Sequence, residues 1–413
     1  MHREMKPMPI NMRRREYLRE NFAQVKLYLR RRPAYAWEAI RDGRALKSVV
    51  RFFRSHAVLT IAFIAAVLTM LIVPPDNSYA GYFDVKTLTC LFSVLAVVRA
   101  LTNVNFFYMI ARRLVALFKN ERMCILALVV ITFIGSMFIA NDMALITFLP
   151  LGYFVLHTSG KEKHMAFTFI MQNIAANLGG MLTLFGNPQN LYLYTKYSIP
   201  TGEFMQILFP PFIVAVSLIV ICCLFIKKEP LSMGDEVEAK CPKWRLSVYL
   251  ALFALSILIV FRGIPYWIGL IVIPIALLVL DRNALKTVDY PLLLTFVCFF
   301  VFSGNMARIE PVRNLFAGLL EKNTLLVGAL SCQVISNVPS AILLSQFTQN
   351  YPDLLIAVNI GGTGTLIASL ASLITFGEFS HHFPERKKEY LIKFSAYNFS
   401  FLAILLLFCE FVI

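Results

Sequence analysis

Long apolar runs alternate with short charged segments along most of the chain. A helix that crosses the hydrocarbon core of a bilayer needs about 20 mainly apolar residues. The pattern therefore predicts an all-α integral membrane protein. The runs that approach this length, and are expected to span, are 56–74, 87–103, 164–186, 204–226, 246–262, 264–280, 290–304, 354–376 and 392–412.

Two further apolar stretches, 123–157 and 323–350, are interrupted midway by polar residues. Asn141 lies at the first interruption and Asn337 at the second. Each stretch is too long for one spanning helix and too short for two full spans with a loop. A re-entrant helical hairpin fits this length, and the whole pattern predicts about nine to eleven transmembrane helices.

The same order of segments occurs twice. An amphipathic stretch, 104–118 or 306–320, precedes each interrupted run, and a glycine-interrupted apolar run follows it. Within these last runs, 177–184 and 359–366 match in register, because each carries Asn, a Gly-Gly pair, Thr and Leu. The pattern predicts an internal repeat with a re-entrant hairpin and a broken helix in each copy.

Loop charges predict the orientation. With the N-terminus in the cytoplasm, loops 75–86 and 187–203 lie outside and are sparse in Lys and Arg, whereas 306–322 departs from the positive-inside rule. The first hairpin then lies on the cytoplasmic side and the second outside, so the repeats are expected to be inverted. The basic loop residues expected in the cytoplasm are Arg112, Arg113, Lys119, Arg122, Lys161, Lys163, Lys227, Lys228, Arg282, Lys286, Arg386, Lys387 and Lys388.

These boundaries predict four parts. Residues 1–53 form a basic cytoplasmic extension, for which a helix on the membrane surface and a disordered tail both remain open. The first inverted repeat is expected over 54–226, and a charged cytoplasmic linker with one connecting span over 227–263. The second inverted repeat is expected over 264–413.

Composition agrees with a membrane protein. Hydrophobic residues make up 58% of the chain and charged residues 15%, whereas a soluble domain has about a quarter of its residues charged. The net charge of +15 comes from short loops and the N-terminal segment, so we expect no nucleic-acid partner. The bilayer is the expected partner, and a cell (inner) membrane, multi-pass location is expected.

Breaks in spanning helices mark the candidate site. Unpaired backbone groups in lipid cost several kcal/mol each, so a helix breaks only where it lines a cavity or is buried in protein. The carbonyls and amide side chains at such breaks suit a small cation, and half-helix N-termini suit an anion. The candidate substrate- and ion-binding residues are Asn141, Asp142, Asn177, Gly179, Gly180, Thr183, Gly186, Asn187, Asn190, Ser336, Asn337, Asn359, Gly361, Gly362, Thr365 and Ser369.

Each feature alone also has a structural explanation. Glycine pairs often serve tight helix packing, and an asparagine such as Asn177 can make an interhelical hydrogen bond. Two pairs in register, each after a break, favour a binding site. An intramembrane carboxylate such as Asp142 is costly and usually functional, although a place at an aqueous hairpin tip is the alternative. A sodium site is expected near Asn141, Asn187 and Asn337, with no other metal or cofactor.

The chain resembles the ion transporter superfamily that contains arsenite permeases, sodium/proton antiporters, citrate–metal carriers and divalent anion/sodium symporters. The resemblance is carried by 141–145, 186–190, 336–341 and the two Asn-x-Gly-Gly-x-x-Thr-Leu blocks, and it covers about 55–412. It implies a scaffold domain and a mobile transport domain, a homodimer and an elevator-like movement. The residues that it assigns to substrate and ion are Asn141, Asp142, Asn187, Ser336, Asn337, Thr365 and Ser369.

The hairpin tips depart from one branch of that superfamily. Dicarboxylate carriers have Ser-Asn-Thr at both tips, whereas this chain has Ala-Asn-Asp at 140–142 and Ser-Asn-Val at 336–338. The loss of two hydroxyls and the added negative charge speak against a dicarboxylate substrate.

The sequence thus predicts a secondary active transporter for a small anion or oxyanion, coupled to sodium or protons. An arsenite efflux permease or a sodium/proton antiporter is the alternative, which Asp142 favours, and a channel is a remote one. We expect no enzyme, because none of the six histidines lies in an HExxH motif.

Overall fold

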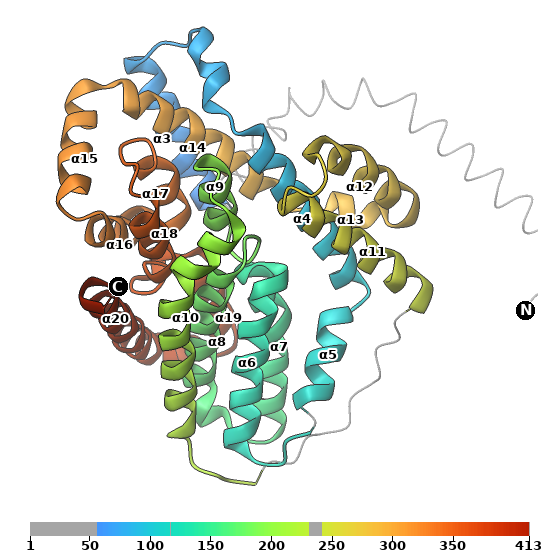
Figure 1. Ribbon diagram of the computed structural model, residues 1–413. Helices are drawn as coiled ribbons and strands as arrows, with labels where there is room; N and C mark the ends of the chain where they lie inside the picture. Colours follow the sequence, from blue (N-terminus) through green and yellow to red (C-terminus); the bar gives the residue numbers. More distant parts are fainter. Residues whose placement is uncertain (1–55, 116, 231–241, 413) are drawn as a thin grey trace, which may run out of the picture. The chain divides into compact units, whose positions relative to one another are not determined.

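The computed structural model describes residues 56–115, 117–230 and 242–412, and these are helical without strands. The expected N-terminal extension over 1–53 lies outside the described residues. Packing is described below for Ala62–Ile413, which forms one compact unit (Figure 1).

Eight α-helices lie within the described residues up to 230. They are joined by three 3₁₀ segments, η1 (Asn77–Tyr82), η2 (Glu162–His164) and η3 (Gly180–Leu182). The α-helices are α3 (Ala57–Ile72), α4 (Val85–Asn103), α5 (Phe106–Val115), α6 (Glu121–Ile139), α7 (Asn141–Thr158), α8 (Met165–Gly179), α9 (Pro188–Lys196) and α10 (Thr201–Leu224).

Ten further α-helices lie within residues 242–412. Two 3₁₀ segments, η4 (Leu366–Ala368) and η5 (Pro384–Arg386), lie on either side of α19. The α-helices are α11 (Lys243–Val260), α12 (Tyr266–Leu280), α13 (Arg282–Lys286), α14 (Tyr290–Arg308), α15 (Glu310–Lys322), α16 (Thr324–Ile335), α17 (Asn337–Leu344), α18 (Tyr351–Ile360), α19 (Leu370–His382) and α20 (Lys387–Val412).

Six helical segments of the described chain are long and apolar enough to cross a membrane. This confirms the all-α membrane class. Five of the six overlap predicted spans, and the sixth, Glu121–Ile139, is the first helix of the first predicted hairpin. The six are Val85–Asn103, Glu121–Ile139, Thr201–Leu224, Lys243–Val260, Arg282–Arg308 and Pro384–Val412, and shorter apolar helices are Ala57–Ile72, Tyr266–Leu280, Thr324–Ile335 and Tyr351–Ile360.

Both interrupted apolar runs form a pair of helices separated by one non-helical residue. α6 ends at Ile139 and α7 begins at Asn141, and the two lie side by side in Figure 1. α16 and α17 repeat this arrangement. The two pairs also begin alike. Asn120 caps α6 and Asn323 caps α16, and in each case the side-chain oxygen accepts a hydrogen bond from the backbone amide three residues later. Re-entry of these pairs into a membrane remains a prediction.

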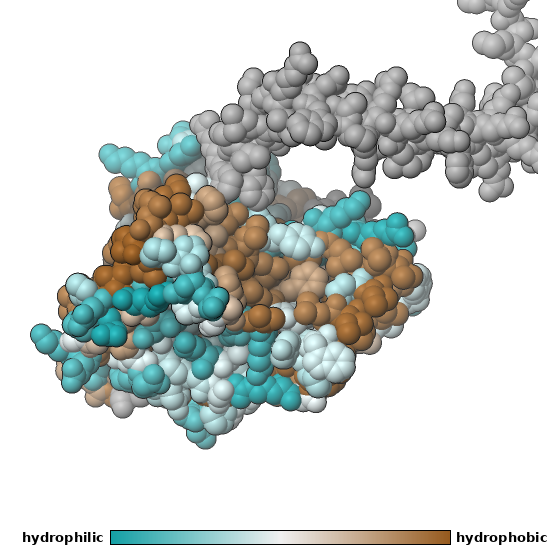
Figure 2. Space-filling view, turned by 90° about the horizontal axis from the view of Figure 1, so that it is seen from above, coloured by the Kyte–Doolittle hydropathy of each residue, from teal (hydrophilic) through white to brown (hydrophobic). Residues whose placement is uncertain are grey.

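The helices pack in distinct groups. α4 packs against α11, α12 and α13 around buried residues such as Leu101, Tyr249 and Ile273. α6, α7, α8 and α10 form a second group in the lower half of Figure 1, with α19 against α7 and α8. Figure 2 shows broad apolar areas on the surface of the protein. Large apolar side chains are exposed on several helices, among them Leu71, Ile221 and Val279. Lipid would cover such areas in a membrane.

Several loops predicted to be cytoplasmic meet one another. Lys161 and Lys163 donate to the Glu229 carboxylate, and these bonds lower its pKa to about 2. The Glu121 amide donates to the Glu229 carbonyl at 2.8 Å. Arg386 donates to the Glu162 carbonyl at 3.3 Å. The loops therefore share one end of this unit, as their common basic character predicts, while the side of the membrane on which they lie stays a prediction.

Candidate functional site

The residue between the two helices of each pair is strained. Ala140 has φ 63° and ψ 153°, and Ser336 has φ 76° and ψ 159°. This region of backbone space is nearly restricted to glycine and costs on the order of 1–3 kcal/mol for other residues. Neither residue is a glycine, so surrounding contacts must hold both breaks open.

The asparagine after each break covers the start of the next helix. Asn141 Oδ1 accepts from the Asp142 amide at 2.9 Å, and Asn337 Oδ1 accepts from the Val338 amide at the same distance. The two segments between α8 and α9 (180–187) and between α18 and α19 (361–369) are not α-helical, and we call them the unwound segments. Each break contacts one of them. The Asn141 amide donates to the Gly186 carbonyl at 3.1 Å, whereas the Ser336 hydroxyl donates to the Ala368 carbonyl at 3.2 Å.

The two unwound segments are joined by a reciprocal pair of hydrogen bonds. Asn187 Nδ2 donates to Asn359 Oδ1 at 3.0 Å, and Ser369 Oγ donates to Asn177 Oδ1 at 2.7 Å. Each bond runs from the end of one unwound segment to the asparagine that opens the other. Residues that are far apart in the sequence thus form one buried asparagine cluster, which we define as Asn141, Asn177, Asn187, Asn190, Asn337, Asn359 and Ser369.

Gly362 marks where the two tips come together. A Cβ added there would lie 3.1 Å from Asn337 Nδ2 and 3.6 Å from Asn177 Oδ1. Asn177 Oδ1 also accepts from Asn141 Nδ2 at 3.1 Å. Both tip asparagines therefore approach the same place, as the sequence predicts, and a side chain at position 362 would require Asn337 to shift by a few tenths of an ångström.

Two amide side chains satisfy the carbonyls of the unwound segments. Asn190 Nδ2 donates to the carbonyls of Gly180, Met181 and Thr183 at 3.0–3.2 Å. Gln333 Nε2 does the same on the other side, donating to the carbonyls of Gly361 and Thr363 at 2.9 and 3.1 Å. Sequence reasoning missed Gln333, although a lone glutamine four residues before Asn337 in an apolar helix is a visible signal.

Several predicted site residues serve packing instead of facing the asparagines. Thr183 and Thr365 donate to the carbonyls of Met137 and Gln333, which ties each unwound segment to the first helix of a hairpin pair, α6 or α16. A Cβ on Gly179 would lie 2.4 Å from the Phe133 carbonyl oxygen. The packing explanation therefore holds for that glycine. Close approach to neighbours also explains Gly186 and Gly361. Gly180 instead faces the asparagine cluster, because a Cβ there would lie 2.5 Å from Asn187 Oδ1.

Three buried polar atoms near the cluster have no hydrogen-bond partner in the described part of the chain. They are Asp142 Oδ1, Asn187 Oδ1 and Asn177 Nδ2. Buried polar groups are nearly always paired, so an unpaired one calls for a ligand or a water molecule. The two oxygens have the chemistry of a cation ligand, and the amide nitrogen can donate to an anion.

Comparison with known proteins gives consistent matches. The family model described as citrate transporter matches residues 49–352. Over 292 residues the chain is 33% identical to an uncharacterized transporter of Methanocaldococcus jannaschii, which covers 70% of this chain and 80% of that protein. It is 28% identical over 309 residues to an inner membrane protein of Escherichia coli, and this match covers 72% of this chain and 81% of that protein. It is 26% identical over 191 residues to a silicon efflux transporter of Oryza sativa subsp. japonica, and this match covers 43% of this chain and 39% of that protein.

These matches agree with the apolar helices and with the sequence motifs. The expected membership of the ion transporter superfamily is confirmed, and the chain is a multi-pass membrane transporter. Because the family match extends over most of its length, the chain belongs to the citrate transporter family.

Proposed function

We propose that this protein is a secondary active transporter that moves a small anion or oxyanion across the cytoplasmic membrane, coupled to sodium or protons. One observation carries the proposal: two helix breaks and two unwound segments converge on a single buried set of asparagines. Broken helices in matching positions are the feature that transporters use to build a site near the bilayer midplane.

The anion would be held by helix ends and amide groups. α7 and α17 both begin at the cluster, and a helix N-terminus carries partial positive charge. Asn177 Nδ2 has no partner in the described chain and can donate to an oxyanion. No cationic side chain is needed for such binding, because a backbone nest at a helix start suffices.

The coupling ion would be held by oxygens. Asp142 Oδ1 and Asn187 Oδ1 are buried without a donor among the described residues. A sodium ion would satisfy both oxygens, whereas a proton would satisfy the Asp142 carboxylate. Asn337 is included in the proposed sodium site because its tip approaches the same cluster at Gly362. The other ligands would come from the carbonyls of the unwound segments.

Movement would follow from two inverted repeats, 54–226 and 264–413, around this site. Matching contacts at the two breaks and the two unwound segments support that relation. The group around α4, α11 and α12 would serve as scaffold, and the helices that carry the asparagines would move against it like an elevator. A homodimer built through the scaffold is part of the same proposal.

A second candidate is arsenite efflux or sodium/proton antiport. The unpaired Asp142 oxygen favours it, since a carboxylate binds a proton or cation with no need of an organic substrate. The similarity to a silicon efflux transporter, although limited to 43% of this chain, also points to small oxyacids as cargo.

The test uses purified protein and liposomes. Thermal unfolding is measured with citrate, phosphate, sulfate or arsenite, each with sodium or with potassium. A ligand at 100 times its dissociation constant stabilises the native state by about 2.7 kcal/mol. We expect one anion class to stabilise the protein and to be taken up when a sodium or proton gradient is applied. Proton flux without any anion would favour the antiporter, and a conducting pore in planar bilayers would refute both.

A further inference from the structure

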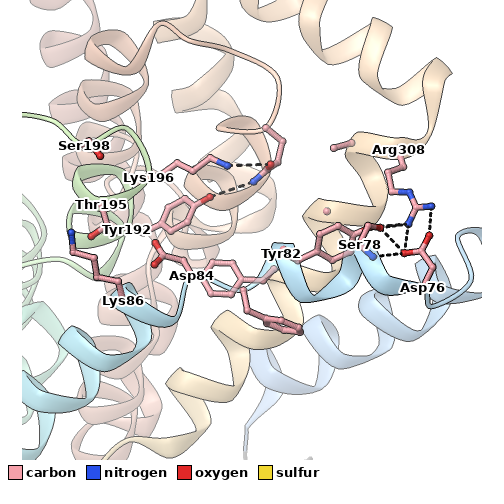
Figure 3. A pocket seen from close by; sticks show the side chains of 16 residues that line it. Asp76, Ser78, Tyr82, Asp84, Lys86, Tyr192, Thr195, Lys196, Ser198 and Arg308 are labelled. Atoms are coloured by element: carbon pink, nitrogen blue, oxygen red, sulfur yellow. Dashed lines mark hydrogen bonds and ion pairs between the residues drawn. The ribbon is translucent and has the colours of Figure 1, made fainter. Parts of the chain in front are cut away.

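A polar cavity of about 860 Å³ lies apart from the asparagine cluster, and we call it the vestibule (Figure 3). One wall comes from η1, the start of α4 and the end of α14. The other comes from the end of α9 and from Gln346, which lies two residues after α17. The lining side chains that matter below are Asp76, Asp84, Lys86, Lys196, Arg308 and Gln346.

The acidic side chains of the vestibule are already engaged. Asp76 pairs with Arg308, with 2.7 Å between Oδ2 and Nη2, and the bonds from Arg308 lower the pKa of Asp76 to about 2. That pair is therefore neutral as a unit at ordinary pH. Asp84 caps α4 by accepting from the amide of Thr87 at 2.9 Å.

The two lysines are not neutralised in the same way. Neither Lys86 nor Lys196 forms an ion pair within the described part of the chain, and Lys196 Nζ reaches only Gln346 Oε1 at 3.5 Å. Figure 3 shows both ammonium groups at the end of the vestibule away from the Asp76–Arg308 pair. Figure 3 shows the Asp84 carboxylate at the same end, and its capping bond leaves its charge in place. Two lysines and one aspartate still make this end net positive, and an excess of one sign of charge in a cleft raises the local concentration of counter-ions.

The vestibule is connected to the asparagine cluster through two helices. α9 carries Asn190 in its first turn and Lys196 as its last residue. α17 begins at Asn337, and Gln346 lies two residues after its end. With a rise of about 1.5 Å per residue, either helix places the vestibule roughly 10 Å from the cluster.

We propose that the vestibule is a first binding site for the transported anion, which Lys86 and Lys196 hold before it reaches the asparagine cluster. The ligand class is a small carboxylate or oxyanion, and the assignment rests on the proposed function only in treating that anion as cargo. The two lysines belong to opposite walls, so a movement of α9 relative to α4 would separate them and weaken the hold on the anion.

The test measures the electrostatic potential in the vestibule and does not require transport activity. Thr195→Cys places a thiol on the vestibule wall, and Gly202→Cys places one outside it, where an added Cβ meets nothing within 4 Å. Purified protein is treated at low ionic strength with an anionic and a cationic methanethiosulfonate of similar size. Mass spectrometry follows modification at the introduced position. Because both reagents react with the same thiol, the ratio of the two rates does not depend on the intrinsic reactivity of that thiol.

We expect the anionic-to-cationic rate ratio to be roughly three- to tenfold higher for Thr195→Cys than for Gly202→Cys. Adding Lys86→Gln and Lys196→Gln should remove that excess, and about 0.5 M salt should reduce it by screening. Citrate or sulfate, compared with chloride at equal ionic strength, should slow modification of Thr195→Cys only while the lysines are present.

An excess that survives removal of both lysines would overturn the proposal, and so would anion protection that does not depend on them. Lysine-dependent protection in a protein that transports none of the tested anions would leave the vestibule site standing. That result would count against the proposed function alone.

Discussion

Asp142 gives the first tip a charge that the second tip lacks, because Val338 is at the matching position. Both Asp142 and Val338 follow a tip asparagine and donate their amides to its side-chain oxygen. The hydrogen bond at the start of the helix therefore forms both at Asp142 and at Val338, so the local fold does not require the carboxylate. A buried, unpaired carboxylate oxygen is costly, which is why a compensating cation is the simplest explanation.

We expect Asp142→Asn to leave expression and assembly nearly unchanged and to abolish or shift the dependence of transport on sodium or pH. Uptake by reconstituted protein, measured with and without each gradient, checks this. The matched variant Val338→Asp should do more harm, because it adds a second carboxylate without a partner. Transport by Asp142→Asn with an unchanged ion dependence would show that the carboxylate is only a solvated tip residue.

Strain at the breaks gives a prediction that does not depend on the substrate. Ala140→Gly should relieve a conformation that costs about 1–3 kcal/mol, against an entropy cost of about 0.5–1 kcal/mol for glycine. We expect the unfolding temperature in detergent to rise, corresponding to about 1 kcal/mol. A matched Ser336→Gly loses its hydrogen bond to the Ala368 carbonyl and should gain less. Equal destabilisation by both variants would contradict the role of strain.

At the scale of elements, apolar run length was enough to locate the helices. The predicted span 204–226 corresponds to α10 at Thr201–Leu224, and 246–262 to α11 at Lys243–Val260. The interruption of 354–376 was predictable from Gly361 and Gly362, because α18 ends at Ile360, directly before this pair. The partner of the freed carbonyls was not predicted, because Gln333 lies on another helix and its contact with Gly361 and Thr363 depends on how the helices pack.

The close contact between α6 and α8 depends on Gly179. A Cβ there would meet the Phe133 carbonyl oxygen at 2.4 Å and Ser136 Oγ at 2.6 Å, so Gly179→Ala should push the helices apart. We expect a loss of about 1–3 kcal/mol in the free energy of unfolding, by thermal unfolding in detergent. Gly377→Ala, on α19 where an added Cβ meets nothing within 4 Å, should be neutral or stabilising. Equal effects of the two variants would contradict the packing argument.

At the scale of the whole molecule, the sequence predicted which segments would meet but not how. The asparagines at both breaks and in both glycine-interrupted runs do converge, because the matched order of segments brings equivalent residues together. The reciprocal bonds from Asn187 to Asn359 and from Ser369 to Asn177 could not be read from the sequence. Such bonds depend on how two distant segments cross, and spacing along one chain carries no information about that. Whether the cluster binds a ligand stays a prediction.

The side of the membrane on which each end lies can be tested with two thiols. α10 has 24 residues and is therefore about 36 Å long, which is enough to cross a bilayer. Gly202 lies at its start. Lys163, whose side chain is 55% exposed, bonds to Glu229 just beyond its end. Residues 163 and 202 must then lie on opposite sides of the membrane.

The positive-inside rule places Lys163 in the cytoplasm, because the loops that meet around Glu229 carry most of the basic loop residues. We therefore expect a membrane-impermeant maleimide to label Gly202→Cys in intact cells and Lys163→Cys only after permeabilisation, with the parent protein as the blank. The reverse pattern would invert the topology and put the vestibule on the cytoplasmic side. Labelling of both positions in intact cells would contradict α10 as a span. Either result would also change which compartment supplies the anion to Lys86 and Lys196.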